Sequence, residues 1–271
     1  MTQLSVASFY RFTAIDDPAA FAARFEVWCV DANLKGSLLV AHEGVNGSLC
    51  GIRAELDFVL ERLRSLPGFS ALCATIVPMP GDAPPFRRLR VRMRAEIVTF
   101  GEDRDAHAPG GTAVDPGTWH RLLDDPLVRV IDVRNVYETM LGGFPGAIDP
   151  HTQNFTEFRA FARDELAKDR DAPIAMYCTG GIRCAKAGAW LISQGFKQVY
   201  ELKNGVLGYL QTVAAEQNRW QGNCFVFDER VSVDRQLLPG GERLCNDCGL
   251  PWRPCDRDAD QRQCDACRSV A

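Results

Sequence analysis

The sequence has no long uninterrupted run of apolar residues. No stretch of its 271 residues approaches the ~20 consecutive apolar residues that a membrane-spanning helix needs. The first residues, MTQLSVASFYRF, have neither the basic start nor the long apolar core of a secretory signal peptide. We therefore expect a cytoplasmic protein with reduced thiols and no membrane partner.

Histidine is scarce, and so is net charge. The 4 histidines lie far apart and form no pattern of two histidines and one carboxylate, which non-haem iron oxygenases use. A Gly-x-Gly-x-x-Gly motif for a dinucleotide is absent too. We therefore expect no flavin, haem or nicotinamide site. The formal net charge is -4, so any contact with nucleic acid requires a local basic patch.

Cysteine is present at 11 positions, which are too few for a disulfide scaffold of this length. Five of the cysteines fall between Cys245 and Cys267. The pairs Cys245-x-x-Cys248 and Cys264-x-x-Cys267 have the spacing of a tetrathiolate zinc site. We predict a structural zinc bound by these four thiolates, with Cys255 as a surplus cysteine. The alternative is a disordered reducing tail without metal.

Cys178 lies in a turn of small residues between a predicted strand and a predicted helix. Residues 173–177 are apolar and predict a short strand, and CAKAGAWLISQ at 184–194 predicts a helix. The intervening turn contains Gly180 and Gly181, which allow backbone N–H groups to point inward. A cysteine at the carboxyl end of a parallel strand lies where α/β sheets bind ligands.

The surroundings of Cys178 favour its thiolate form. The inward amides, the N-terminus of the following helix and Arg183 all stabilise a negative charge on sulfur. The alternative is a buried and inert cysteine, the usual state of this residue type. Cys184 follows the turn, either as a thiol that resolves an oxidised Cys178 or simply as a small residue in the helix.

The first hundred residues predict a ferredoxin-like domain. Strands are expected at 5–12, 36–41, 48–51 and 71–77, and helices at 18–33 and around Leu56 to Leu63. This β-α-β-β-α-β order is the ferredoxin-like pattern. A further strand is expected at 89–100.

The start of that further strand alternates between apolar and basic residues. Leu89, Val91 and Met93 are expected to face the core. The opposite face would carry the arginine row, which consists of Arg88, Arg90, Arg92 and Arg94. We interpret this row as a contact for RNA phosphates. The alternative is a sheet edge that charge protects from pairing.

The sequence divides into four predicted segments: a domain over 1–100, a polar linker over 101–115, an α/β domain over 116–222 and a cysteine-rich segment over 223–271. In the α/β domain, strands alternate with helices, which predicts a parallel sheet. A predominantly apolar strand predicted at 128–133 contains Asp132 and is followed by Arg134 and Glu138. We interpret these three residues as structural ion-pair partners rather than as catalytic acids or bases.

The motif Cys178-x-x-Gly181-x-Arg183 resembles the active loop of rhodanese domains, whose cysteine carries a persulfide. Only four residues separate the cysteine from the arginine, whereas the related phosphatases have five and a wider cradle. The stretches 132–138, 142–147 and 204–209 also resemble rhodanese motifs, in the same order along the chain.

The whole arrangement resembles the rhodanese-type tRNA uridine(34) hydroxylases. Its N-terminal domain carries AHEGVNG at 41–47, and a cysteine-rich tail follows the rhodanese domain. The resemblance implies an oxidoreductase that converts uridine 34 of tRNA to 5-hydroxyuridine with molecular oxygen and an unidentified electron donor. It also implies the anticodon stem-loop as partner and Cys178 and Arg183 as catalytic residues. From the residue pattern itself we expect Gly180, Gly181 and the arginine row to contact the substrate.

The residues leave the chemistry open. A thiolate at Cys178 can add to C6 of uracil, or a persulfide on Cys178 can serve as nucleophile or reductant. A rhodanese sulfurtransferase is the alternative function, because it would use the same loop. A non-catalytic RNA-binding protein would need the arginine row but not an activated cysteine.

Overall fold

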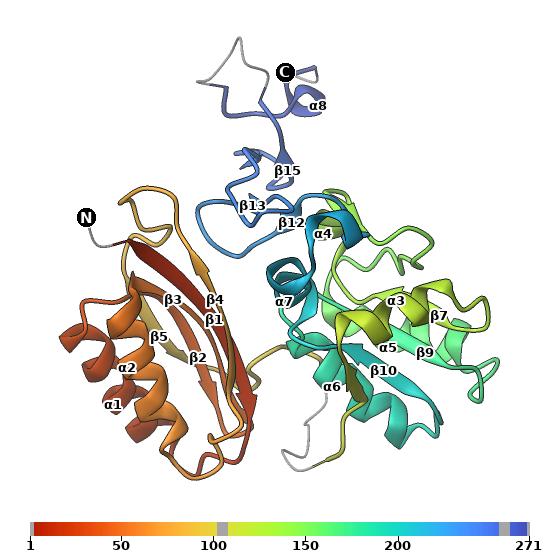
Figure 1. The fold of residues 1–271 in the computed structure, drawn as a ribbon, viewed down its shortest axis with the longest axis horizontal. Helices are drawn as coiled ribbons and strands as arrows, with labels where there is room; N and C mark the ends of the chain where they lie inside the picture. The colour runs from red at the N-terminus through yellow and green to blue at the C-terminus, as the bar shows by residue number, and fades with distance from the viewer. Residues whose placement is uncertain (1–2, 102–107, 255–260, 270–271) are drawn as a thin grey trace.

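The computed structural model describes residues 3–101, 108–254 and 261–269. Two sheets lie side by side, and the C-terminal segment rises above the space between them (Figure 1). Residues 102–107 of the predicted linker lie outside the described residues, as does Cys255. No helix in the described part of the chain is long and apolar enough to cross a bilayer. The predicted domain boundaries stay predictions.

The N-terminal domain has the predicted ferredoxin-like fold. It consists of β1 (Leu4–Phe12), α1 (Pro18–Asp31), β2 (Lys35–Ala41), β3 (Gly44–Ile52), α2 (Arg53–Arg64), β4 (Cys73–Pro78) and β5 (Leu89–Met93). The strand order is β4-β1-β3-β2-β5, in which β5 extends the sheet beyond the usual four strands. The helices α1 and α2 cover the face that points away from the second domain (Figure 1).

Apolar periodicity explains why these helices pack where they do. In α1, Phe21, Phe25 and Trp28 recur at helical spacing and are all buried. They meet strand residues such as Leu38 and Leu49, which have no exposed surface, in one core cluster. The helix begins where predicted, because the carboxylate of its cap, Asp17, accepts a hydrogen bond from the third following amide.

The strand β5 is shorter than the sequence predicts, and the prediction that Met93 faces the core is wrong. Leu89 and Val91 pack against the core, but Met93 is 54% exposed. The only strand that pairs with β5 among the described residues is β2, whose Val40 is the last partner, opposite Met93. Because β2 ends at Ala41, no strand remains to pair with residues 94–100, and the predicted strand ends there.

The second domain has the predicted parallel sheet. Apart from the helical turns between β8 and β9, its elements as far as α7 are β6 (Thr112–Val114), α3 (Pro116–Asp124), β7 (Arg129–Asp132), α4 (Val136–Thr139), β8 (Gly142–Gly143), β9 (Ile174–Tyr177), α6 (Ile182–Ser193), β10 (Val199–Leu202) and α7 (Gly205–Thr212). The order β6-β10-β9-β7 is parallel throughout. Aromatic rings fill one side of this sheet, where Phe144 meets Tyr177 edge to face at 5.0 Å between centroids.

Residues 155–166 form three joined helical turns. They are a 3₁₀ turn (Phe155–Glu157), α5 (Phe158–Phe161) and a π turn (Ala162–Leu166). The buried residues Phe158, Ala162 and Leu166 follow one another at intervals of four, which exceeds the ~3.6 residues of an α-helical turn. The wider π turn keeps these residues on one buried face.

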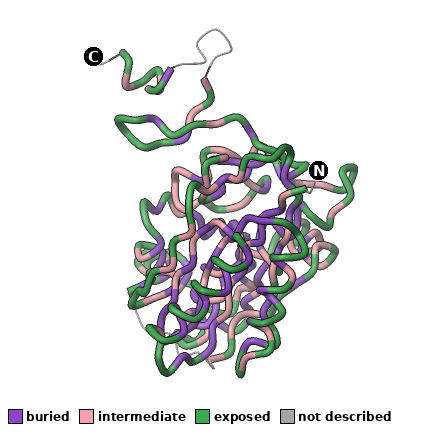
Figure 2. The backbone as a smooth tube through the Cα atoms, turned by 90° about the vertical axis from the view of Figure 1, so that its left-hand side faces the viewer, coloured by how far each residue is buried: buried purple, intermediate pink, exposed green. Residues whose placement is uncertain are grey.

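The chain after α7, including the C-terminal segment, is built from short pieces. They are a 3₁₀ turn (Ala215–Gln217), β11 (Gln221–Gly222), β12 (Cys224–Phe225), β13 (Ser232–Val233), β14 (Arg243–Leu244), β15 (Pro251–Trp252) and α8 (Asp265–Arg268). Figure 2 shows that buried residues concentrate in the body, whereas the tail, the described residues from Gly241 onward, is mostly exposed. Such a tail has little apolar core of its own. The preceding residues Cys224, Val226 and Val233 pack into the core of the second domain.

A buried ion cluster joins the two domains. The ammonium group of Lys186 on α6, which is 1% exposed, donates to both carboxylate oxygens of Glu43 at 2.9 Å. It also donates to Glu96 at 2.5 Å and to the carbonyl of Val98 at 3.2 Å. Burial would raise the pKa of Glu96, but its hydrogen bonds with Lys186 and with two backbone amides outweigh this effect and lower it. The cluster therefore fixes α6 against the N-terminal domain.

Replacing Lys186 tests this anchor. Lys186→Met should lower the free energy of unfolding by about 3–5 kcal/mol, because it leaves two carboxylates at the interface without their cation. Urea unfolding followed by circular dichroism measures the loss. The control is Lys168→Met, which removes a surface lysine paired with Glu165 and should cost no more than about 1 kcal/mol. Equal effects of the two substitutions would contradict an anchoring role.

Candidate functional site

The turn after β9 places Cys178 at the carboxyl edge of the parallel sheet, as the sequence predicts. Tyr177 ends β9, and α6 begins four residues after Cys178, at Ile182. Gly181 has a φ of +96°, a conformation that glycine adopts without strain. This conformation aims the amide of Gly181 back at the cysteine, and the amide donates a hydrogen bond to Sγ of Cys178 at 3.2 Å.

The loop lowers the pKa of Cys178 to about 6. Burial alone would raise this pKa, because it penalises the charged form. The thiol of Cys184, the positive charge of Arg183 and the backbone amides of both residues outweigh burial by stabilising the thiolate. Cys184 itself has a pKa well above the usual range, because it is buried beside that thiolate. At neutral pH Cys178 is therefore charged, and Cys184 is its hydrogen-bond donor.

Arg183 is held by a carboxylate within the protein. Its guanidinium group donates to both oxygens of Glu138, at 2.5 and 2.7 Å, and both side chains are buried. The hydroxyl of Thr179 donates to the same carboxylate at 2.9 Å. Arg183 therefore positions the loop and contributes its charge to Cys178. The substitution Arg183→Ala would leave Glu138 buried without its cation, so it would affect folding as well as activity.

A second buried pair supports the structural interpretation of the three charged residues near β7. The guanidinium group of Arg134 donates to Asp132 at 2.6 and 2.9 Å, and its side chain has no exposed surface. It also donates to the carbonyl of Gly142 at 2.6 Å. All three members of this predicted set, including Glu138, therefore lie in ion pairs within the fold.

The N-terminal domain contributes Tyr10 to the site, which the sequence did not reveal. A Cβ atom built on Gly181 would lie 3.1 Å from the hydroxyl oxygen of Tyr10. Burial, followed by the nearby charges of Glu201 and Cys178, raises the pKa of Tyr10, so its phenol stays neutral. Nothing in the sequence pairs β1 with a loop so distant along the chain. The contact depends on how the two domains dock.

Access to the sulfur is restricted. Cys178 has no exposed surface, whereas a Cβ atom built on Gly180 would meet nothing within 4 Å. The open side of the loop is therefore at Gly180. A substrate that approaches from this side reaches the sulfur only if the loop or the side chains that cover it move.

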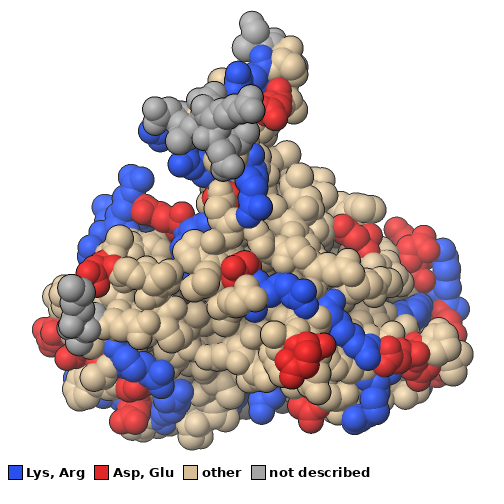
Figure 3. Space-filling model, turned by 45° about the horizontal axis from the view of Figure 1, so that its top comes forward, with Lys and Arg blue, Asp and Glu red and all other residues tan. Residues whose placement is uncertain are grey.

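The arginine row lies at the outer edge of the N-terminal sheet. All four of its side chains belong to exposed residues, but the guanidinium group of Arg94 donates to the carbonyl of Met93. Arg88 and Arg90 line a groove of about 970 Å³ between β5 and the C-terminal segment. We call it the arginine groove, because its lining also includes Arg87, Arg243 and Arg262. Figure 3 shows basic side chains on both sides of the hollow below the tail.

The four predicted metal ligands come together in the tail. The sulfur atoms of Cys245, Cys248, Cys264 and Cys267 all lie within 4.8 Å of one another. The sulfurs of Cys248 and Cys264 are 3.8 Å apart. A tetrahedral zinc with Zn–S bonds of ~2.3 Å requires sulfur separations of about 3.8 Å, so the cluster fits zinc. Cys255 lies outside the described residues.

Comparison with known proteins identifies the family. One family model, the UPF0176 acylphosphatase like domain, matches residues 4–97, and the Rhodanese-like domain model matches residues 115–212. The tRNA uridine(34) hydroxylase of Caulobacter vibrioides is 45% identical over 266 residues, which cover 95% of this chain and 83% of that protein. The protein of the same name from Synechococcus elongatus is 43% identical, with 92% of each chain covered. The chain belongs to the tRNA uridine(34) hydroxylase family.

Membership in the tRNA uridine(34) hydroxylase family confirms the predicted resemblance and both predicted domain folds. The assignment of individual residues to catalysis, substrate binding and metal binding stays a prediction. The structure gives the geometry around them, and it places Tyr10 beside the loop of Cys178.

The pKa of Cys178 predicts how its thiolate titrates. Thiolates absorb in the ultraviolet, and the part of this absorbance that is missing from Cys178→Ser belongs to Cys178. This part should titrate with a midpoint near 6. In a Cys184→Ala background this midpoint should move up toward the free value of ~8.5, because the hydrogen bond from the Cys184 thiol is lost. The control is Cys29→Ala, which removes a buried thiol of the other domain and should leave the midpoint in place. A midpoint above 8 in the unmodified loop would contradict the description of the site.

The sulfur cluster predicts about one zinc per chain. Protein prepared without chelator should contain the metal by elemental analysis, and Cys248→Ser should lose most of it because three thiolates bind zinc more weakly than four. Cys73→Ser, at an exposed cysteine of β4, is the control and should retain it. Cys255→Ser should retain it as well. Metal-free protein with an ordered tail would contradict the zinc site.

Proposed function

We propose that this protein hydroxylates uridine 34 of tRNA to 5-hydroxyuridine with molecular oxygen, and that Cys178 carries out the chemistry. Its relatives are named for this modification, and they match nearly the whole chain. The observation that supports the role of Cys178 is its thiolate at the carboxyl edge of the sheet. The proposed site of action is the cytoplasm, where tRNA is modified.

The proposed chemistry begins with addition of the Cys178 thiolate to C6 of uracil. The new S–C6 bond places the displaced electron pair at C5, which becomes an enolate-like carbon that takes up oxygen as a hydroperoxide. A two-electron donor of the thiol class then reduces the O–O bond, and one oxygen leaves as water. Loss of the C5 proton and of the thiolate restores the double bond and leaves a hydroxyl at C5. The net change consumes one oxygen molecule, two electrons and two protons.

The loop suits both the first step of this reaction, attack by the thiolate, and the last step, its departure. A thiolate whose pKa lies near 6 is available at neutral pH, and it is also a good leaving group. Cys184 donates a hydrogen bond to the sulfur and stabilises it when it departs with its electron pair. Glu138 and Thr179 hold Arg183 in place, so the positive charge stays beside the sulfur throughout. A persulfide on Cys178 is the alternative nucleophile, and the loop would stabilise its anion by the same amides.

A rhodanese sulfurtransferase is the second candidate function, since the loop resembles those that carry a persulfide. The arginine groove favours the RNA-modifying function, because transfer of sulfur between small molecules needs no extended basic surface. We also propose that Cys245, Cys248, Cys264 and Cys267 hold a structural zinc, which would keep the wall of that groove folded.

Cells that lack the gene provide the test of function. Wild-type protein should restore 5-hydroxyuridine at position 34, as measured by nucleoside analysis of purified tRNA. Cys178→Ser should restore none, because a protonated hydroxyl is a far weaker nucleophile, while its affinity for tRNA should stay unchanged. The control is Cys73→Ser, which should restore the modification fully.

Two results would separate the candidate functions. Restoration by Cys178→Ser would show that the loop is not the catalytic centre. Transfer of sulfur from thiosulfate to a thiol by the wild-type protein, with no change in tRNA, would favour the sulfurtransferase.

A further inference from the structure

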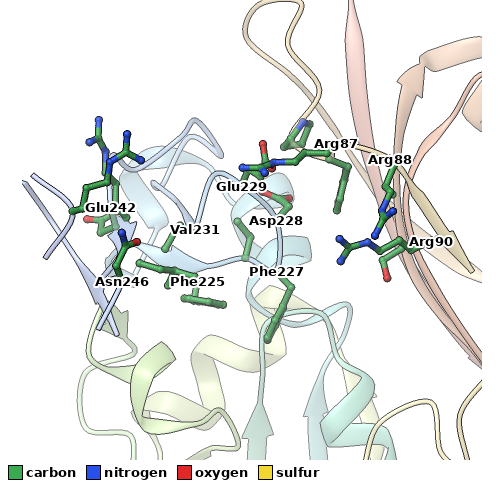
Figure 4. A pocket seen from close by; sticks show the side chains of 18 of the residues that line it. Arg87, Arg88, Arg90, Phe225, Phe227, Asp228, Glu229, Val231, Glu242 and Asn246 are labelled. Atoms are coloured by element: carbon green, nitrogen blue, oxygen red, sulfur yellow. The ribbon is translucent and has the colours of Figure 1, made fainter. Parts of the chain in front are cut away.

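The arginine groove has one wall from each end of the chain. Arg87, Arg88 and Arg90 come from the N-terminal domain, whereas Phe225 and Phe227 come from the C-terminal segment. Figure 4 shows the arginines on one side of the groove and the two phenylalanines on the other. The arginine groove therefore has a basic wall from the N-terminal domain and a second wall that carries both aromatic and charged residues.

The acidic residues of the arginine groove are already engaged within the protein. Asp228 accepts hydrogen bonds from Arg230 at 2.5 and 2.9 Å, and Glu229 pairs with Arg87 at 2.5 Å. Glu242 accepts hydrogen bonds from Asn223 at 2.9 and 3.0 Å.

Three other side chains of the arginine groove, those of Arg88, Arg90 and Arg262, have no carboxylate partner within the described ranges. All three belong to exposed residues. The arginine groove therefore offers unpaired positive charge to a ligand with several negative groups.

The aromatic wall leads to the loop of Cys178. Phe227 is 64% exposed, and its ring centroid lies 5.9 Å from the guanidinium carbon of Arg183. The ring of Phe225 lies 5.2 Å from that of Phe227 and 5.1 Å from that of Tyr137 on α4. An exposed phenylalanine thus stands at the point where the arginine groove meets the positioning arginine of the loop.

We propose that the arginine groove binds the single-stranded nucleotides next to the target uridine, with Arg88 and Arg90 on phosphates and Phe227 stacked on a base. Proteins hold single strands by this combination of a basic groove and aromatic side chains. The inference rests on the proposed hydroxylation of tRNA, and it assigns the path of the RNA to a face that includes the tail. A base on Phe227 would place its neighbour beside the loop.

Substitution of Phe227 tests the stacking contact. Phe227→Ala should weaken the binding of an anticodon stem-loop RNA about 5- to 150-fold, because stacking on an aromatic side chain contributes about 1–3 kcal/mol per base. The dependence of binding on salt should not change, because no charge is lost. Fluorescence anisotropy measures both quantities. The control is Phe58→Ala on α2, a phenylalanine that is 53% exposed and lies outside the groove, and it should bind like wild type.

Substitution of the two arginines tests the phosphate contacts. Arg88→Gln combined with Arg90→Gln should weaken binding and reduce the slope of log affinity against log salt by roughly 1.4, since each contact with a single strand contributes about 0.7. Arg53→Gln combined with Arg163→Gln removes the same charge from exposed residues outside the groove and should leave the slope nearly unchanged. Wild type should also bind the stem-loop more tightly than an RNA duplex with the same number of phosphates.

The outcomes show separately whether the groove assignment fails and whether the proposed function fails. Wild-type affinity in Phe227→Ala, equal effects of the test and control arginine pairs, or equal affinity for the duplex would each overturn the groove assignment. These results would leave the hydroxylation intact, because wild type would still form 5-hydroxyuridine. Absence of that product from wild type would contradict the proposed function instead, whatever the binding data show.

Discussion

The buried ion pair between Arg183 and Glu138 is the interaction on which the site depends. It joins the helix α6, which follows the loop, to the short helix α4, and it also receives the hydroxyl of Thr179. Without it a charged group would remain in the interior without a partner. With it, the loop holds a positive charge beside Cys178, and the amides that stabilise the thiolate keep their direction. The low pKa of Cys178 is therefore a property of the folded loop.

Docking of the two domains adds contacts to the loop of Cys178 that its own domain does not provide. The cluster around Lys186 holds α6 against the N-terminal domain, and the same arrangement brings Tyr10 to Gly181. The C-terminal segment closes the opposite side of the arginine groove. The arginine groove is thus lined by residues of the N-terminal domain and of the C-terminal segment, and the loop of Cys178 lies against the N-terminal domain at Tyr10.

The sequence predicts local features well, because periodicity and turn residues are local signals. It places Cys178 at the end of β9, predicts both domain folds and brings four cysteines together at the spacing of a zinc site. It does not predict contacts that depend on docking, such as Tyr10 at the loop, or the extent of a strand whose partner ends early, as at Met93. The sequence indicates that Glu138 forms a structural ion pair, but it does not show that the partner is Arg183.

The pH dependence of a single turnover tests the central claim most directly, because it links the titration of Cys178 to the chemistry. With tRNA bound and oxygen in excess, the thiolate mechanism predicts a rate that rises as the pH passes through about 6 and is then constant at neutral pH. In Cys184→Ala the midpoint of the rate should move upward together with the titration of Cys178. A rate profile that keeps its midpoint in Cys184→Ala, while the thiolate titration moves, would contradict attack by the Cys178 thiolate.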